Sequence, residues 1–237
     1  MSYFERIQLL PLGSYEYHGK ELPPETDTII ANAVARSVLT NLSQTLEGSI
    51  QLLPTIAYGL SLEHVGMPST AYIEHNTFYA FVREVLHTVS APKDLIVFVN
   101  GHGGNMDTLA ALEGEFNCTF QDRKVFFTKL FRGPIDKMCV DMFGENDVHA
   151  GSVEASLISY YERRPPREYL VSLSQRVRGS LRFFRSSEIA PEGVIKTDPK
   201  VIADPEKGSI LHAAIAEYIS DSILDLIKNL GPILEKQ

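Results

Sequence analysis

The sequence predicts an α/β protein: a single three-layer α/β/α domain over residues 1–237, with a mixed, mostly parallel central sheet. Two observations predict this class. Short apolar runs alternate along the chain with segments of helical period, which is the pattern of a sheet covered by helices. Polar clusters that contain histidine, glycine and carboxylates follow the apolar runs, and the sites of parallel sheets gather at the carboxyl ends of strands.

Uninterrupted apolar runs predict the strands. They cover Ile7–Leu12, Ile50–Ile56, Asp94–Asn100 and Lys124–Leu130. The first run ends at Gly13, and the third, DLIVFVN, is the clearest buried strand of the chain. Short apolar runs without alternation are typical of strands that are buried on both faces.

Apolar residues that recur with the period of a helix predict five helices. They cover Asp27–Leu42, Thr77–Val89, Met106–Phe116, Ser152–Glu162 and Ile210–Leu230. Thr26 or Asp27 is available as the N-cap of the first helix, and Pro165-Pro166 ends the fourth. Leu170–Phe184 receives no assignment, and Ser186–Glu206 is predicted to be a loop rich in proline and glycine.

Composition and charge narrow the class of protein. A net charge of −8 and a pI near 5.4 disfavour binding to nucleic acid or to membrane surfaces, although a small anionic ligand in a local pocket stays compatible. Cys118 and Cys139 have no paired spacing, and the N-terminal stretch interrupts its apolar residues with Glu5 and Arg6. No apolar run approaches the roughly 20 residues that a membrane span needs. We expect a soluble, cytoplasmic protein.

The first polar cluster, GSYEYHGKELPPETD, follows the run 7–12 and contains Glu16, His18 and Asp27. Glu16 and His18 are two residues apart, so they point the same way in extended backbone. Carboxylate and imidazole groups are ligands that Zn²⁺, Mn²⁺ and Fe²⁺ accept. The alternative is a solvated loop in which Asp27 only caps the following helix.

The second cluster, NGHGGN, spans residues 100–105 directly after the clearest strand. Three glycines around His102 indicate a tight backbone that fixes the imidazole at the turn. A plain connection with Asn105 as N-cap is one alternative. Phosphate binding at the helix start is another, although both the Walker lysine and the dinucleotide-binding spacing are missing.

The third cluster, DVHAGSVE, spans residues 147–154 at the start of a helix. With Gly151 as N-cap, Glu154 occupies the third helical position, where a carboxylate can bond back to free amides. His149 just before it is either a surface residue or part of a site. A single metal site at the edge of the sheet would explain all three clusters together.

These motifs resemble the creatininase family of metal-dependent amidohydrolases. The family pattern has Gly-Ser-x-Glu-x-His-Gly with an Asp eleven residues after the Glu, then Asn-Gly-His-Gly-Gly-Asn, then His-Ala-Gly-x-x-Glu. This chain matches all three, and the segment GVIKTDPKVIADPEKG resembles the late Gly-Asp-Pro…Lys-Gly segment of the family. The likeness covers nearly the whole chain and implies a creatininase-like fold.

The resemblance implies two divalent metal ions per subunit, drawn from Fe²⁺, Zn²⁺ or Mn²⁺. Asp27 would bridge the ions, Glu16 and His102 would complete one site, and His18 would bind the other, with Glu154 as the candidate for its remaining ligand. His149 matches the histidine that transfers protons in the family. Glu154 is also a candidate catalytic group that orients or deprotonates the attacking water.

Two departures from creatininase itself bear on the site and the substrate. The GH-x-E motif of creatininase has a glutamate where this chain has Gly104, which leaves the second metal less certain. Creatininase also has a tryptophan over its substrate, whereas this chain has none. Creatinine is therefore a poor substrate candidate.

The segment GLSLEHVGMPST, residues 59–70, resembles the archaeal branch of the family that hydrolyses a formamide in flavin and deazaflavin biosynthesis. We therefore expect a formylamino-pyrimidine ribonucleotide phosphate as the substrate. Glu63 and His64 would bind it, and Lys20 is the candidate cation for its phosphate, with Arg132 as a second candidate.

Other activities remain open within and outside the family. They are hydrolysis of creatinine or another cyclic amide, trimming of a redox peptide, and non-catalytic ligand binding on the same fold. The family resemblance also implies a homo-oligomer.

Overall fold

The computed structural model describes residues 3–144, 149–172 and 184–235. Its central sheet has four strands in the order β2-β1-β3-β4, with bounds β1 Arg6–Leu12, β2 Ser49–Leu52, β3 Asp94–Asn100 and β4 Lys124–Lys129. All neighbouring pairs are parallel, with Leu12 opposite Asn100 and Asn100 opposite Lys129. The carboxyl ends of β1, β3 and β4 therefore meet at one edge of the sheet.

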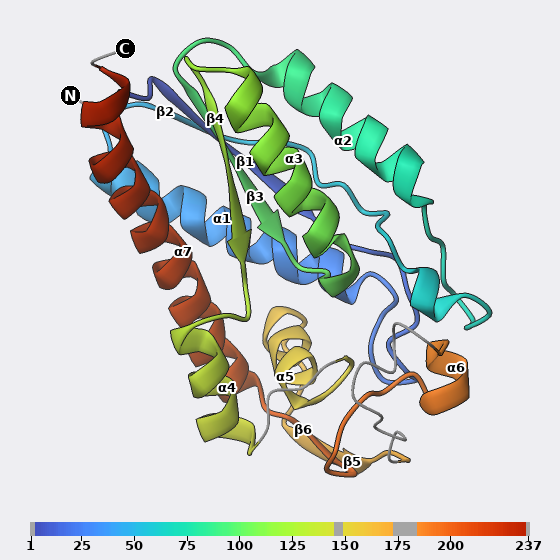
Figure 1. Ribbon diagram of the computed structural model, residues 1–237. Coiled ribbons are helices and arrows are strands. Elements are labelled where there is room, and N and C mark those ends of the chain that lie inside the picture. Colours follow the sequence, from blue (N-terminus) through green and yellow to red (C-terminus); the bar gives the residue numbers. More distant parts are fainter. Residues whose placement is uncertain (1–2, 145–148, 173–183, 236–237) are drawn as a thin grey trace.

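Helices cover both faces of this sheet (Figure 1). On one face, α2 (His75–Val89) and α3 (Met106–Thr119) pack on Leu10, Leu12, Ile96 and Phe98. On the other face, α1 (Thr26–Thr45) and α7 (Pro205–Leu234) pack on the alternate residues Leu9, Leu95 and Val97. Because side chains alternate between faces along each strand, uninterrupted apolar strands need a helical layer on both sides.

The remaining elements lie beyond the carboxyl ends of the strands (Figure 1). Helices α4 (Pro134–Phe143) and α5 (Ser152–Tyr161) join the core of the α1–α7 face. β5 (Arg167–Leu170) and β6 (Lys200–Ala203) form a separate antiparallel pair, and α6 (Ser186–Ile189) is a single turn. Two short 3₁₀ helices, η1 (Leu62–His64) and η2 (Gly103–Asn105), precede α2 and α3.

The structure confirms the predicted α/β class and its mostly parallel sheet, and it corrects several elements. β2 ends at Leu52, and beyond it only an isolated bridge joins Ile56 to Leu12. The predicted loop Ser186–Glu206 contains α6, β6 and the start of α7. Of the unassigned stretch Leu170–Phe184, residues 173–183 lie outside the described part of the chain, as do Asp147 and Val148 of the third cluster. Within the described residues, no helix is both long and apolar enough to cross a membrane.

Candidate metal centre and substrate cavity

The side chains of the three sequence clusters converge at the carboxyl edge of the sheet. Glu16 and His18 follow β1, His102 follows β3, and Asp27 lies in the first turn of α1. Six of the predicted site residues are buried, namely Glu16, His18, Asp27, His64, His102 and His149. The solvated-loop alternative for the first cluster is therefore wrong, and the residue at the N-cap of α1 is Glu25 rather than Thr26 or Asp27.

One group of potential metal ligands consists of Glu16, Asp27 and His102, whose candidate ligand atoms all lie within 4.8 Å of one another. The Nδ1 atom of His102 is 2.9 Å from Oδ2 of Asp27 and 3.5 Å from Oε1 of Glu16. Two carboxylates and one imidazole whose donor atoms lie this close together are a suitable set of ligands for a divalent first-row metal.

A second group of the same kind consists of His18, Asp27 and Glu154. The Nε2 atom of His18 is 3.3 Å from Oδ1 of Asp27 and 3.8 Å from Oε2 of Glu154. Asp27 therefore faces one histidine with each of its carboxylate oxygens, Oδ2 toward His102 and Oδ1 toward His18. This is the arrangement that a carboxylate bridging two ions requires.

Three backbone carbonyls orient the imidazoles. Each carbonyl can only accept a hydrogen bond, so the ring nitrogen that it contacts carries a proton, and in the neutral ring the other nitrogen presents its lone pair. Nδ1 of His18 donates to the carbonyl of Glu16, and Nε2 of His102 donates to that of Leu60, each over 2.9 Å. When the rings are neutral, the lone pairs of His18 Nε2 and His102 Nδ1 consequently face Asp27.

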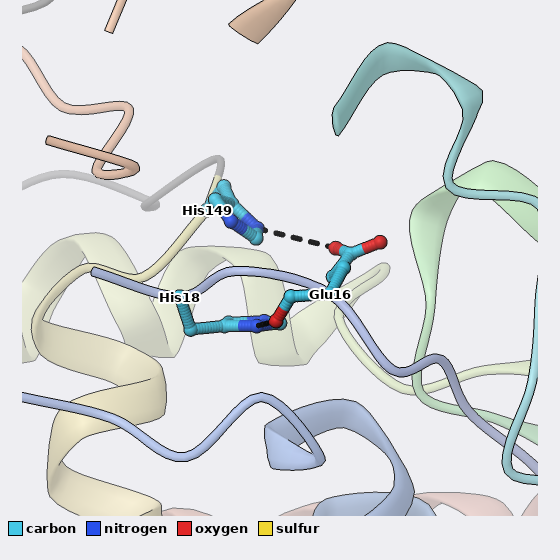
Figure 2. Close-up of side chains that lie close together, drawn as sticks. All are labelled: Glu16, His18 and His149. Carbon is cyan, nitrogen blue, oxygen red and sulfur yellow. Dashed lines mark hydrogen bonds and ion pairs between the residues drawn. The ribbon is translucent and has the colours of Figure 1, made fainter. Parts of the chain in front are cut away.

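His149 is held in the same way. Its Nε2 donates to the carbonyl of Tyr17 over 2.9 Å, and its Nδ1 is 3.5 Å from Oε1 of Glu16. Figure 2 shows the His149 ring directed at the Glu16 carboxylate, with the His18 ring beneath. The centroids of the two rings are 4.2 Å apart. His149 is thus next to both groups of potential ligands.

Sequence reasoning missed the residues that support these side chains. The hydroxyl of Ser14 donates to Oδ2 of Asp27 over 2.8 Å. The amide of Asn105 accepts from the Leu60 backbone N–H and donates to the Gly13 carbonyl and to Asn100, so it ties three loops of the site together. Both residues lie inside the recognised motifs. Their position in the sequence close to the candidate ligands could have identified them as supporting residues.

Glu154 makes the predicted helix-start contact and also belongs to a group of potential metal ligands. It lies at the third position of α5 after the N-cap Gly151, and its Oε2 accepts the backbone N–H of Ala150 over 2.6 Å. The same oxygen faces Nε2 of His18. A helix-start contact and a metal-facing position are therefore compatible in one carboxylate.

Burial controls the electrostatics of the centre. It raises the pKa of Glu16 to about 6, because a carboxylate away from water is disfavoured. Burial works against charge on His18 and His102 as well, but the carboxylates of Asp27 and Glu16 outweigh it and raise the pKa of each histidine to about 10. For Asp27 the cost of burial is in turn outweighed by His18 and His102, which lower its pKa.

The centre fits a cation better than it fits an empty polar cluster. Among the described residues, Oε2 of Glu16 is buried without a hydrogen-bond partner. Native structures rarely leave such an atom unsatisfied, and without an ion the buried carboxylates depend on protonated His18 and His102 for compensating charge. A divalent ion at each group would supply that charge and a partner for the carboxylate oxygens.

Glu63 and His64 lie on η1 and line a cavity next to the candidate metal centre. Nε2 of His64 is 3.6 Å from Oε1 of Glu16, and its ring centroid is 4.4 Å from that of His149. Burial and the neighbouring His18 lower the pKa of His64 to about 3, so the ring is neutral. His64 is buried and Glu63 is half-buried.

The cavity beside the metal ligands has a volume of about 550 Å³, within the few hundred to about 1,000 Å³ of small-ligand sites. Lys20 does not line it: this side chain is exposed and lies near Glu192, whose pKa it helps to lower after the larger effect of Ser172. The prediction that Lys20 binds substrate is therefore not supported. Arg132 and Lys129 line the cavity instead.

The comparisons with known proteins define the class. The model of the Creatininase family, described as creatinine amidohydrolase, matches residues 4–223. The chain belongs to this family of hydrolases, as its motifs predicted.

Curated relatives in the family are named mycofactocin precursor peptide peptidase. The protein from Mycobacterium ulcerans is 44% identical over 154 residues, which is 63% of this chain and 56% of the relative. The protein from Mycolicibacterium smegmatis is 43% identical over 103 residues, 44% of this chain and 42% of the relative. The aligned region thus spans about half the length of these relatives.

Solved structures show the same fold. A creatininase described as its Mn form has a TM-score of 0.73 at 18% identity, with 94% of this chain and 91% of that chain covered. A putative creatinine amidohydrolase from Bacteroides fragilis has a TM-score of 0.71 at 20% identity, with 94% and 90% covered. A mutant creatininase described as the Zn-Zn type reaches 0.71 at 18% identity, with 94% and 91% covered.

Proposed function

We propose that this protein is a metal-dependent amidohydrolase that cleaves an amide bond of a precursor peptide. The observation that carries the proposal is Asp27, which faces His102 with one oxygen and His18 with the other at the wall of a cavity. Family membership supports amide hydrolysis, and the names of the relatives support a peptide substrate. They fit the peptide-trimming alternative better than the formamide of flavin biosynthesis.

Two divalent ions would be held by the two groups of ligands: Glu16, Asp27 and His102 for one, and His18, Asp27 and Glu154 for the other. When bound, such ions polarise an amide carbonyl and lower the pKa of water to near neutrality. Glu154 supplies the carboxylate that Gly104 does not carry. The backbone carbonyls of Glu16 and Leu60 hold the ligand nitrogens in place for this role.

His149 transfers the proton. Burial, together with His18 and His64, holds its pKa well below the usual range, so the ring is neutral at physiological pH. Its Nε2 proton is engaged by the Tyr17 carbonyl, which leaves the Nδ1 lone pair free to accept a proton at the edge of the metal centre. A protonated ring in this surrounding is a strong acid, and it would readily pass the proton to the departing amide nitrogen.

The test is hydrolysis by the purified chain reconstituted separately with Zn²⁺, Mn²⁺ and Fe²⁺. A mycofactocin precursor peptide and the formylamino-pyrimidine nucleotide are the two substrates, followed by mass spectrometry of the peptide and by formate release. Asp27→Asn removes one carboxylate oxygen from the shared position, and Asp225→Asn, at an exposed position of α7, is the matched control.

We expect metal-dependent cleavage of the peptide that falls at least about 100-fold in Asp27→Asn and is unchanged in Asp225→Asn. Formate release without peptide cleavage would show that the substrate is the formamide nucleotide rather than the peptide, and the proposed metal chemistry would stand. Equal activity of the two variants would contradict the metal centre itself.

A further inference from the structure

Strand β4 is at one edge of the central sheet, so no described strand pairs with its outer side. Helix α3 lies along this side and forms hydrogen bonds with it (Figure 1). Natural proteins cover or interrupt such edges, because free backbone N–H and C=O groups pair readily with other extended chains. The partners of the outer backbone groups of β4 therefore show which part of this edge is protected.

Side chains of α3 protect the first part of the edge. The side-chain amide of Asn117 accepts the N–H of Val125 over 2.7 Å and donates to the carbonyl of the same residue over 2.8 Å. One turn earlier on the helix, a carboxylate oxygen of Glu113 accepts the N–H of Phe127 over 2.9 Å. These two side chains take the place of a neighbouring strand as far as the N–H of Phe127.

The protection stops before the strand ends. The N–H and C=O of one residue point to the same side of a strand, and this side alternates along the chain. The next outer groups are therefore the carbonyl of Phe127 and the N–H of Lys129, and no described residue forms a hydrogen bond with either. The residue that continues the series Asn117 and Glu113 along α3 is Ala110, whose methyl group can form none. We call these two groups the open edge.

The open edge adjoins the substrate cavity. Lys129, Leu130 and Phe131 line this cavity at the end of β4 and directly after it, and Met106 and Asp107 line it from the start of α3. The part of the strand that α3 leaves unprotected is therefore the part beside which a substrate would lie.

The metal centre is within reach of a chain at the open edge. Lys129 is the register partner of Asn100, and His102 follows Asn100 by two residues. Neighbouring strands are about 4.8 Å apart, so a chain outside β4 lies about 10 Å from the line of β3, a distance that about three extended residues cover. A peptide held at the open edge can therefore place one of its amides at the metal centre.

We propose that an extended segment of the substrate peptide pairs with the open edge, about three residues from the amide that is cleaved. The inference rests on the proposed function and adds the way in which the substrate is held. Amide groups of the peptide would donate to the carbonyl of Phe127 and accept from the N–H of Lys129, as when a strand is added to the edge of a sheet. Creatinine and nucleotides have no extended amide backbone, so this contact selects for a peptide.

Ala110→Gln tests the proposal on the protein. A glutamine here continues the series of Asn117 and Glu113, and its amide can bond to the open edge in place of the peptide. Ala111→Gln, also at an exposed position of α3, is the matched control. Calorimetry measures binding of the mycofactocin precursor peptide to the metal-reconstituted full chain, in a His149→Gln background that slows hydrolysis. We expect Ala110→Gln to weaken binding about tenfold and Ala111→Gln to leave it unchanged.

Ester substitutions in the peptide test the same contact without changing the protein. Each replaces one amide, which removes one N–H and makes the neighbouring carbonyl a weaker acceptor. In a series of peptides with one ester each, we expect binding to fall about fivefold where the ester lies in the paired segment. That loss should persist in Ala111→Gln and disappear in Ala110→Gln, because the glutamine has already replaced the peptide at the open edge.

The outcomes separate this inference from the proposed function. An ester effect that Ala110→Gln abolishes, in a chain whose wild type hydrolyses the peptide with none of the three metals, supports the edge contact and contradicts the proposed function. Ester effects that are equal or absent in Ala110→Gln and Ala111→Gln overturn the edge contact, and hydrolysis by wild type then leaves the proposed function standing. A wild-type dimer that Ala110→Gln dissociates, measured by analytical ultracentrifugation, would assign the open edge to a second copy of this chain and overturn the peptide as its partner.

Discussion

Each histidine proposed as a metal ligand donates a hydrogen bond to a backbone carbonyl, and Gly104 lies directly against one of these contacts. A Cβ atom on Gly104 would lie 2.1 Å from the carbonyl oxygen of Leu60 and 2.5 Å from Nε2 of His102. These are the two atoms whose hydrogen bond orients His102. The position at which the creatininase motif has a glutamate therefore admits no side chain in this backbone, and Glu154 on α5 is the proposed source of the second carboxylate.

Gly104→Ala tests this point, and its neighbour provides a matched control. The new methyl group must displace either Leu60 or the His102 ring, so we expect metal affinity to fall at least tenfold and the free energy of unfolding to fall by about 1–3 kcal/mol. A Cβ on Gly103, which also lines the cavity, meets no atom within 4 Å. Metal titration and denaturant unfolding of Gly103→Ala should match wild type. Equal metal affinity in both variants would show that the Leu60 contact does not hold His102.

Residue types and spacing were sufficient to find the groups that converge, but not the direction of every side chain. Glu16, His18, Asp27 and His102 come from motifs whose glycines and strand ends fix the backbone, so their meeting could be predicted. Lys20 belongs to the same motif but points to solvent near Glu192. Arg132, the second candidate cation, lines the cavity together with Lys129, which the sequence did not single out; β4, which Lys129 ends, lies beside β3. Strand order is not encoded in local periodicity.

At the scale of elements, the buried parallel strands and amphipathic helices were predictable because their apolar patterns are long. Most of the elements that were missed are short or begin with polar residues, although the ten-residue helix α4 was missed as well. The start of α7 reads PEKGS, so its period becomes visible only at Ile210, whereas Asp204 caps the helix by accepting from the backbone N–H of Glu206 and Lys207. β5 and β6 have four residues each, and their exposed positions alternate with covered ones.

Helix α5 carries Glu154, so the contact of α5 with α7 supports the metal centre. Gly208 of α7 faces α5: a Cβ there would lie 2.1 Å from the carbonyl oxygen of Ser156, two residues after Glu154. We expect Gly208→Ala to push the helices apart, to lower the free energy of unfolding by about 1–3 kcal/mol and to weaken metal binding. Thermal unfolding and metal titration measure the two effects.

Gly114 of α3 is the matched control for Gly208. It is exposed in the middle of a helix, and a Cβ there meets nothing within 4 Å. Gly114→Ala should therefore raise stability by about 0.5–1 kcal/mol through helix propensity alone and leave metal binding unchanged. A Gly208→Ala protein that is stabilised as well would show that α5 and α7 can separate at no cost.

At the scale of the whole molecule, the centre joins parts of the chain that are far apart in sequence. Its ligands come from the loop after β1, the start of α1, the loop after β3 and the start of α5. Asn105 and Ser14 connect these segments further through hydrogen bonds. Folding therefore buries several carboxylates close together, which costs free energy. Because a bound cation would offset this cost, we expect metal binding to stabilise the folded chain.

Metal removal should therefore destabilise the entire chain. An ion at 100 times its dissociation constant adds about 2.7 kcal/mol to the free energy of unfolding, which corresponds to roughly 5–10 °C in Tm for a protein of this size. We expect EDTA to lower the Tm of wild type and of Asp225→Asn by this amount. The Tm of Asp27→Asn should be the same with and without EDTA, because the shared ligand of both groups is incomplete. Calorimetric scans paired with metal analysis of each sample measure this. A wild-type Tm that stays constant while the metal content falls to zero would mean that the carboxylates of the centre are tolerated without a cation, and the argument from the orphaned oxygen of Glu16 would fail.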